Sequence, residues 1–497
     1  MDDSCGSARL YNQVPQCEND PMSTQCLMQY PHSGAVAPAA HIGARAAYRQ
    51  LTGGDTELAR LFLDQQLTLS ARLACDLPHA PDGLRPWVTR QAAGVAVQYR
   101  DYLCARSQGA ARCFFGNRAH ALYFLRCVAP TKLVDGAWLY WVLRRWDDNA
   151  YRPLVKTYLE ELGEGMPDKN HVALYQRLLD THACNDWQDL DDTYFVQGAI
   201  QLALGHAGDG FLPELIGYNL GYEQLPLHLL VTAYELNELG IDPYYFTLHL
   251  TVDNAATGHA HDAVDALLRA LAQAADPAAF YQRVRAGYRL NAIGIGSEQV
   301  IAGFDVEREL VRVLAGKAAT GQNMHSDYCR VAGKTINSWL ADTRQIPALL
   351  RAFEDSGWIK RGAAPAASRF WRLIQGERAE MFGVFSAYEQ QVLADFIQGP
   401  DTIDDLAAAV RAPSFRARQR ACAPRSAPPA QAHPVRALFR NGAVGAAADV
   451  LRTLEQQVAA APTRTDAMAL LVSHMSPARH HGAAGLMATR LFAGLLA

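Results

Sequence analysis

The sequence predicts an all-α protein, and three observations support that fold class. Apolar residues recur at three- and four-residue spacing through most of the 497 residues, which is the period of one face of an α-helix. Glycine and proline fall between these periodic segments, where helices are expected to begin and end. Runs in which apolar and polar residues alternate, as in β-strands, are scarce. We therefore expect a bundle of amphipathic helices.

The pattern divides the chain into four regions. Residues 1–40 contain four prolines and little periodicity, which predicts a poorly ordered segment. The main helical bundle is expected over 41–320, and an accessory helical region over 321–410. Residues 411–497 form a tail rich in Ala, Arg and Pro, which predicts a solvated linker that packs little, followed by short helices.

Within the main bundle, each expected helix is a stretch with apolar residues on one face. These stretches are residues 55–77, 85–107, 133–148, 151–165, 170–182, 210–240, 242–255 and 261–275. In the accessory region, two or three helices fit within 335–362 and 368–399, with an aromatic-rich turn around Phe370 and Trp371. In the tail, a short helix is expected at 445–461 and another near the end.

Composition and charge exclude several classes of protein. Apolar residues make up 49% and charged residues 19%, which is ordinary for a globular protein. Lys+Arg is 46 and Asp+Glu is 50, a net charge of −4, which argues against nucleic acid as a partner held by bulk charge. The sequence contains no run of about 18 apolar residues, so it predicts no membrane span. The chain starts with acidic residues and has no apolar core there, which does not indicate a secretory signal. Its ten cysteines form no CxxC pair, which favours reduced thiols, so we expect a cytoplasmic protein.

One short motif imitates a known site. AGKT at Ala332–Thr335 is similar to the end of a phosphate-binding loop, but that loop needs a glycine where Tyr328 stands. The sequence also contains no GxSxG hydrolase motif and no HExxH zinc motif. These signals therefore predict no nucleotide site, serine hydrolase or zinc protease.

Carboxylates and histidines recur in three blocks of the main bundle. LEELGEGMPDKNH contains Glu160 and Glu161, and His171 follows Glu161 by ten residues. GYNLGYEQLPLH places Glu223 inside an apolar, aromatic segment that we expect to be helical. An ionised carboxylate in such surroundings costs several kcal/mol unless it is paired or binds a metal ion.

The third block is PYYFTLHLTVDNAATGHAH, which contains His249, Asp253, His259 and His261. His249 and Asp253 are four residues apart, so they share one face of a helix. Carboxylates and His–Asp pairs on separate helices are the ligand types of di-iron sites in helical bundles. Carboxylates bind hard ferric ions, and imidazole suits iron in both common oxidation states.

Each of these residues also has an ordinary structural interpretation. A single buried His or Glu is usually a hydrogen-bonded core residue. His249 and Asp253 can form a hydrogen bond within one helix. Glu161 can be an exposed carboxylate at a helix end. The co-occurrence of Glu–His, Glu and His–Asp in this order favours a metal site.

At these residues the chain resembles the haem-oxygenase-like di-iron oxidases, a family of iron-containing redox enzymes. The resemblance covers about residues 120–265 and, more loosely, 330–400. It implies a haem-oxygenase-like helical bundle that binds two irons without haem. It assigns Glu161 and His171 to the Glu–His step of the family pattern, Glu223 to its middle Glu, and His249 and Asp253 to its His-x3-Asp step.

Two further ligands follow the resemblance less closely. Asp135 stands where the family has its first carboxylate on a helix, although Glu is usual there. The last histidine of the pattern would fall on Ala256, and the next candidate is His259. A straight helix would place His259 about 15 Å along its axis from His249. DNAATG is poor helix sequence, and a break there would bring His259 back toward the site.

Alternatives remain open for several positions. His261 is a substitute for His259, and Glu214 for Glu223, while His228 reads as a core residue or as a support for the ligands. Arg144 or Arg145 can bind a substrate carboxylate, and a surface role is equally compatible with the sequence.

The resemblance implies an O2-dependent oxidoreductase with two Fe2+ ions as cofactor and O2 as cosubstrate. It implies a small amino-acid-like or fatty-acid-like substrate, often in natural-product biosynthesis. The reaction would be N-oxygenation, desaturation or oxidative C–C cleavage. An external electron donor and a homodimer are options that the sequence leaves open.

Two other hypotheses compete with a di-iron enzyme. One is a metal-free enzyme of the same fold, for which Cys127 or Cys104 would be the nucleophile. The other is a non-enzymatic interaction protein whose working part is 321–497 and whose bundle binds no metal.

Overall fold

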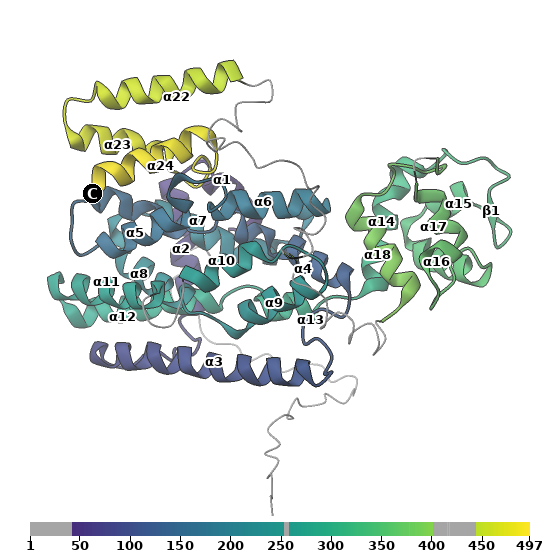
Figure 1. Ribbon diagram of the computed structural model, residues 1–497, viewed down its shortest axis with the longest axis horizontal. Coiled ribbons are helices and arrows are strands. Elements are labelled where there is room, and N and C mark those ends of the chain that lie inside the picture. Colours follow the sequence, from purple (N-terminus) through teal and green to yellow (C-terminus); the bar gives the residue numbers. More distant parts are fainter. Residues whose placement is uncertain (1–41, 253–257, 377, 401–414, 416, 418–443) are drawn as a thin grey trace, which may run out of the picture. The chain divides into compact units, whose positions relative to one another are not determined.

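The computed structural model of the protein describes residues 42–252, 258–376, 378–400, 415, 417 and 444–497 (Figure 1). The predicted segment 1–40 and most of the predicted linker lie outside these residues. In the described part, helices make up nearly all regular structure, which confirms the all-α prediction. No described helix has the combination of length and apolar character that a membrane span requires.

The first part of the described chain contains fourteen α-helices. They are α1 (Ala44–Leu51), α2 (Thr56–Ser70), α3 (Leu84–Ser107), α4 (Arg118–Lys132), α5 (Arg152–Glu161), α6 (His171–His182), α7 (Val196–His206), α8 (Leu212–Tyr222), α9 (Leu227–Glu238), α10 (Tyr244–Val252), α11 (His259–Gln273), α12 (Pro277–Arg289), α13 (Ser297–Ala302) and α14 (Val306–Gly321). Short 3-10 helices lie between them: η1 (Pro81–Gly83), η2 (Ala137–Arg145), η3 (Gly163–Gly165), η4 (Asp186–Asp189), η5 (Asp192–Phe195), η6 (Asp209–Phe211) and η7 (Leu290–Ala292).

Side-chain caps account for several of these helix starts. The Asp55 carboxylate accepts a hydrogen bond from the Leu58 N–H at the start of α2. The side-chain oxygen of Asn117 does the same for α4, and that of Asn170 for α6. Such caps satisfy backbone donors that the first helical turn leaves without a partner. Because Asn170 caps α6, His171 becomes the first residue of that helix.

Two predicted helices are interrupted, each for a backbone reason. Residues 133–148 form a turn and then η2, because Gly136 has a φ of 80° that an α-helix does not allow. Residues 210–240 divide into η6, α8 and α9, with Pro226 directly before α9. Proline lacks an N–H and disfavours helical geometry in the residue before it, so the helix ends there. Both breaks lie next to residues of the candidate site.

The helices of the site pack against one another within the bundle. α11 packs against α5 and α8, and α10 packs against α6 and α9. Figure 1 shows α8, α11 and α12 together in teal. Fully buried aromatic residues fill the space between these elements, among them Trp138, Tyr158 and Tyr218. Large apolar side chains of this kind contribute most to core stability.

The region after α14 begins with a small β-hairpin, β1 (Arg330–Val331) and β2 (Lys334–Thr335), paired antiparallel. AGKT is therefore the turn and second strand of this hairpin: Ala332 and Gly333 both have positive φ, 49° and 76°, as tight hairpin turns require. The helices that follow are α15 (Ile336–Leu340), α16 (Ile346–Asp355), α17 (Arg369–Ile374) and α18 (Ala387–Gln398), with η8 (Thr343–Gln345) and η9 (Pro365–Ala367).

The prediction of an aromatic-rich turn around Phe370 and Trp371 is wrong, because both residues lie in α17. The Phe370 ring is buried and stacks on Phe353 of α16 with 5.0 Å between ring centroids. Packing against α16 thus stabilises a short helix that local sequence preference does not indicate.

The end of the chain forms α22 (Val444–Ala459), α23 (Arg464–His474) and α24 (Ala483–Leu496). The expectation that the tail packs little is wrong for residues 464–497. Met468, Leu471 and Phe492 are fully buried, and α24 contacts η3. The overall Ala and Pro content did not indicate these apolar faces. Burial depends on which face of a helix an apolar residue occupies, and composition does not report that.

Candidate metal centre

Six of the seven predicted metal ligands lie in the described residues, and all six are at least 91% buried. Their exposed fractions are Asp135 1%, Glu161 3%, His171 1%, Glu223 4%, His249 8% and His259 3%. The seventh, Asp253, lies outside the described residues. Three carboxylates and three imidazoles that are buried together need hydrogen bonds or cations to offset the loss of hydration.

Most of these side chains project from the ends of helices. Glu161 is the last residue of α5, and His171 is the first of α6. His259 is the first residue of α11, which is separate from α10. His249 alone lies well within a helix, α10. Side chains at helix ends from different elements can converge on one point without a long helix running through it.

Two residues occupy positions that differ from the prediction. Asp135 was expected on a helix but lies in the turn between α4 and η2. Glu223 was expected inside a helix but is the first residue after α8. The backbone breaks at Gly136 and Pro226 cause both differences. Neither change removes the side chain from the site, since both carboxylates remain buried among the other candidate ligands.

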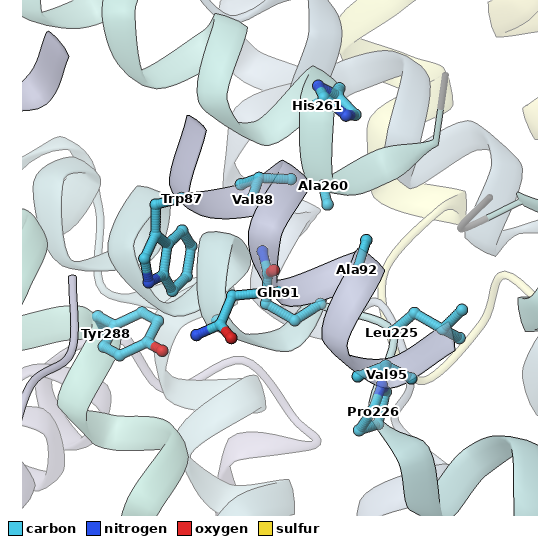
Figure 2. Close-up of a pocket in the computed structure, with 12 residues that line it drawn as sticks. Trp87, Val88, Gln91, Ala92, Val95, Leu225, Pro226, Ala260, His261 and Tyr288 are labelled. Atoms are coloured by element: carbon cyan, nitrogen blue, oxygen red, sulfur yellow. The ribbon is translucent and has the colours of Figure 1, made fainter. Parts of the chain in front are cut away.

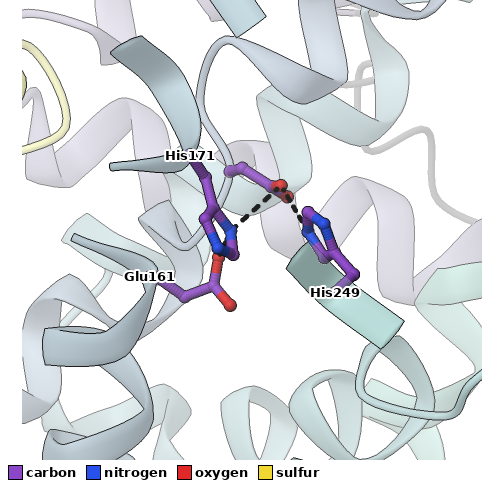
Figure 3. Close-up of side chains that lie close together, drawn as sticks. Glu161, His171 and His249 are labelled. Atoms are coloured by element: carbon purple, nitrogen blue, oxygen red, sulfur yellow. Dashed lines mark hydrogen bonds and ion pairs between the residues drawn. The ribbon is translucent and has the colours of Figure 1, made fainter. Parts of the chain in front are cut away.

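One group of potential ligands contains Asp135, Glu161, His171 and His249. Each offers one donor atom, and these four atoms lie within 4.8 Å of one another. His171 Nδ1 lies 2.5 Å from a Glu161 oxygen and 3.8 Å from Asp135 Oδ2. His249 Nε2 lies 3.3 Å from the same Asp135 oxygen. Figure 3 shows His171 and His249 turned toward a common carboxylate, with Glu161 on the other side of His171.

A second group contains Glu161, Glu223 and His259, again with donor atoms within 4.8 Å. His259 Nδ1 lies 3.0 Å from a Glu223 oxygen and 4.0 Å from Glu161 Oε1. Glu161 therefore belongs to both groups, with Oε2 nearest the first and Oε1 nearest the second. Glu161 thus has one oxygen facing each group.

Hydrogen bonds orient the ligands of the first group. His249 Nδ1 donates to the backbone carbonyl of Tyr245 at 2.8 Å, which orients the ring so that Nε2 faces Asp135. Asp135 accepts hydrogen bonds from the hydroxyls of Tyr245 and Tyr222. Burial alone would raise the pKa of Asp135, but Lys132 and the two imidazoles outweigh it and hold this pKa well below its usual range. Asp135 is therefore an anion.

A different contact orients the ligand of the second group. His259 Nε2 lies 2.7 Å from Glu160, so Nε2 can donate to that carboxylate while Nδ1 faces Glu223. Burial raises the pKa of Glu160, but its hydrogen bond with His259 and the charge of Lys156 outweigh burial and lower it. Glu160 is thus a charged partner that sets the orientation of the His259 ring.

Gly136 allows the turn that carries Asp135 to pack closely against Glu161 at the end of α5. It follows Asp135 directly and has a φ of 80°, in the left-handed region that glycine adopts readily. A Cβ atom at this position would lie 2.8 Å from Cβ of Glu161. Any larger residue would therefore displace the turn that carries Asp135 or the end of α5 that carries Glu161.

The donor set is compatible with iron binding. Three carboxylate groups bring negative charge, and Lys132 brings one positive charge to the first group, 3.9 Å from Asp135. A divalent cation would offset the remaining negative charge among these buried side chains. Carboxylate and imidazole donors without thiolates are typical of non-haem iron sites.

The alternative candidates lie in other surroundings. Glu214 is at the start of α8 and forms an ion pair with Arg283 at 2.6 Å. Arg145 pairs with Asp209 at 2.5 Å, and Arg144 stacks over the Trp141 ring. Neither potential metal group contains any of these residues, nor His228 or His261.

A cavity of about 210 Å³ is lined by sequence neighbours of the second group (Figure 2). Its wall includes Gln224, the residue after Glu223, and Ala260 and His261, the two residues after His259. Side chains of α3, including Trp87 and Val88, also line the cavity. The remaining lining residues are Gln91, Ala92, Val95, Gly221, Leu225, Pro226 and Tyr288. These described lining residues are mainly apolar and aromatic, with two amides and one imidazole.

Three supporting residues had no predicted role: Glu160, Tyr222 and Tyr245. Tyr222 and Glu160 directly precede predicted ligands, and Tyr245 lies four residues before His249. This helical spacing places the Tyr245 carbonyl within reach of the His249 ring. The spacing was therefore a usable signal for Tyr245. Nothing local pointed to the contact between Glu160 and His259, which joins α5 to α11.

Comparison with known proteins agrees with this geometry. Residues 122–292 match the family model of the iron-containing redox enzymes. The matched range includes all six described ligand candidates, and the family's bundle is helical, as observed here. No curated protein and no solved structure matches the chain significantly. The resemblance found in the sequence is confirmed over residues 122–292, which match the family model of the iron-containing redox enzymes.

Proposed function

We propose that this chain is a non-haem di-iron oxidase or oxygenase that uses O2 to oxidise a small organic substrate. One iron would bind to Asp135, Glu161, His171 and His249, and the other to Glu161, Glu223 and His259. The observation that carries this proposal is the position of Glu161, which belongs to both buried ligand groups. Asp253, which the resemblance also names, is retained as a candidate ligand.

When bound, a ferrous pair supplies the electrons that activate O2 toward oxidation of a substrate. The residues of this chain hold and shield that site. Tyr222 and Tyr245 orient Asp135, and the Tyr245 carbonyl orients His249. Glu160 orients His259. The buried surroundings exclude water, which protects reactive species from side reactions.

The substrate would enter through the cavity beside Glu223 and His259. Its mainly apolar and aromatic lining suits an alkyl or aryl group. The amino-acid-like or fatty-acid-like class, and the choice among N-oxygenation, desaturation and C–C cleavage, remain proposals from the family resemblance. An external electron donor and a homodimer are further parts of this proposal.

The two competing hypotheses receive less support. Cys127 is buried, and burial raises the pKa of its thiol to about 12, so it is a poor nucleophile. Cys104 is exposed and near the end of α3. A protein that acts only through 321–497 would leave the clustered carboxylates and histidines of the bundle without a role.

Metal stoichiometry tests the proposal directly. The full-length protein is loaded with Fe(II) without oxygen, desalted, and its iron counted per chain. The loaded protein is then mixed with O2, and oxygen consumption and the visible spectrum are recorded. We expect two irons per chain and rapid consumption of O2. Mn(II) loading in parallel tests the choice of metal.

A matched pair of histidine variants controls this experiment. His249→Ala should bind less iron and lose iron-dependent O2 consumption. His206→Ala is the control, because His206 is equally buried, at 8% exposed, and belongs to neither ligand group. It should bind iron as the wild type does. Wild-type protein that retains no iron, with and without candidate amine and acid substrates, would refute the proposal.

A further inference from the structure

We infer that His480, in the C-terminal segment, is a positioning residue for the proposed metal centre. It lies outside residues 122–292, the range of the family match. His480 contacts Asn170, and Asn170 holds both ends of the turn between the proposed ligands Glu161 and His171. This inference rests on the proposed function, because it assigns His480 a role in metal binding.

The turn between Glu161 and His171 has an unusual backbone. Three consecutive residues, Gly163, Glu164 and Gly165, have positive φ values of 63°, 51° and 76°. Glu164 is not a glycine, and a positive φ costs such a residue conformational energy. This geometry therefore persists only while contacts from outside the turn hold it in place.

Asn170 provides one set of these contacts. Its side-chain oxygen accepts from the Ala173 N–H at 3.0 Å and so caps α6, the helix that begins at His171. Its amide nitrogen donates to the Leu162 carbonyl at 3.2 Å, directly after Glu161. One amide side chain thereby links the backbone next to both proposed ligands.

His480 completes the hydrogen bonds of Asn170. Because the Asn170 oxygen faces a backbone N–H, its amide nitrogen must face His480 Nδ1, at 3.0 Å. That nitrogen donates, so Nδ1 accepts and the ring carries its proton on Nε2. Burial, and next the neighbouring His481 and His171, lower the pKa of His480 to about 3, which keeps the ring neutral. Both Asn170 and His480 are at most 1% exposed.

Other contacts dock the same C-terminal segment onto the turn. α24 packs on η3, and a Cβ on Gly165 would lie 2.3 Å from the Leu486 carbonyl. The Tyr158 hydroxyl, three residues before Glu161, donates to the Met475 carbonyl at 2.7 Å. The segment from Met475 to Leu486 therefore contacts the turn and the end of α5, with His480 between these contacts.

Loss of the His480 acceptor would leave a buried amide donor without a partner. Such a group costs free energy, and the Asn170 side chain would turn toward another acceptor. Its cap on α6 and its bond to Leu162 would then weaken. Residues that orient metal ligands in this indirect way typically change metal affinity by about 10- to 100-fold.

The test measures metal affinity rather than turnover. Full-length wild type, His480→Phe, His480→Asn and His481→Phe are titrated with Co(II) without oxygen, and visible absorption reports cobalt ligation. Phe keeps the ring but lacks an acceptor. Asn offers a side-chain oxygen near the position of Nδ1. His481 is the matched control, because it neighbours His480 and has no described contact with Asn170.

We expect His480→Phe to bind at least one cobalt about 10-fold more weakly, whereas His480→Asn and His481→Phe bind as the wild type does. Circular dichroism checks that each variant is folded; if His480→Phe is not, His480→Ala replaces it. Equal affinity of wild type and the folded acceptor-less variant would overturn the inference alone. A wild type that binds no cobalt would overturn the proposed function as well.

Discussion

The two ligand groups share Glu161 but differ in how the protein surrounds them. Buried groups orient the first: Tyr222, Tyr245 and the Tyr245 carbonyl hold Asp135 and His249. The second depends on Glu160, whose side chain is 26% exposed and pairs with Lys156, which is 60% exposed. The sequence neighbours of Glu223 and His259 in the second group, Gln224 and Ala260, line a cavity.

This difference suggests a division of labour within the proposed centre. Ligands fixed by buried hydrogen bonds lose little conformational entropy on binding a metal, so the first group should bind iron more tightly. The residues that follow Glu223 and His259 line the cavity, and the second group has a solvent-accessible support, which suits exchange of substrate. Four sets of variants test this comparison, in order of decreasing effect.

Glu161→Ala should have the largest effect, because Glu161 belongs to both groups. We expect the variant to retain no iron after desalting, whereas the wild type retains two per chain. Iron analysis by mass spectrometry measures this directly, and circular dichroism without metal checks the fold. Retention of two irons would show that Glu161 is not a shared ligand.

His249→Ala and His259→Ala should each affect one position. His249→Ala removes a ligand of the first group and His259→Ala a ligand of the second, so each should retain about one iron. If the first group binds iron more tightly than the second, the iron retained by His259→Ala should be bound more tightly than the iron retained by His249→Ala. Fe(II) titrations give both affinities. Equal affinities in the two variants would contradict the proposed asymmetry.

Glu160→Gln should weaken only the second position. The amide oxygen can still accept from His259, but the negative charge is lost, and we expect about 10-fold lower affinity there. Glu57→Gln is the matched control, because Glu57 is exposed, lies on α2 and belongs to neither group. An unchanged affinity in Glu160→Gln would mean that Glu160 does not orient His259.

Tyr245→Phe should have the smallest effect. It removes one hydrogen bond to Asp135 but keeps the ring and the backbone carbonyl that orients His249. One such bond contributes about 1 kcal/mol, so the affinity of the first position should fall by roughly fivefold. The second position should be unaffected. A larger loss at the second position than at the first would contradict the assignment of Asp135.

Much of the site was predictable because its ligands recur at characteristic intervals. The ten-residue step from Glu161 to His171 and the chemistry of three blocks selected five residues that the structure brings together, and the family resemblance added Asp135. Apolar periodicity likewise predicted an all-α fold. Such patterns are local, so a linear sequence contains them in full.

The errors share a different physical origin. Asp135 and Glu223 were expected on helices, but the backbone breaks at Gly136 and Pro226 place them outside. Phe370 was expected in a turn, but packing on α16 stabilises the helix in which it lies. The tail was expected to pack little, yet Met468 and Phe492 are fully buried. Local preference is weak where tertiary contacts compete with it.

The sequence by itself determined the helical class, the family resemblance of residues 122–292 and the chemical types of the candidate ligands, because periodicity and residue spacing are properties of short segments. Only the tertiary structure decided that Glu161 faces both groups, that Glu160 supports His259, and that His480 lies against Asn170, 310 residues earlier in the chain. These contacts join elements far apart in sequence. Their geometry depends on how several helices pack at once, and no spacing along the chain encodes it.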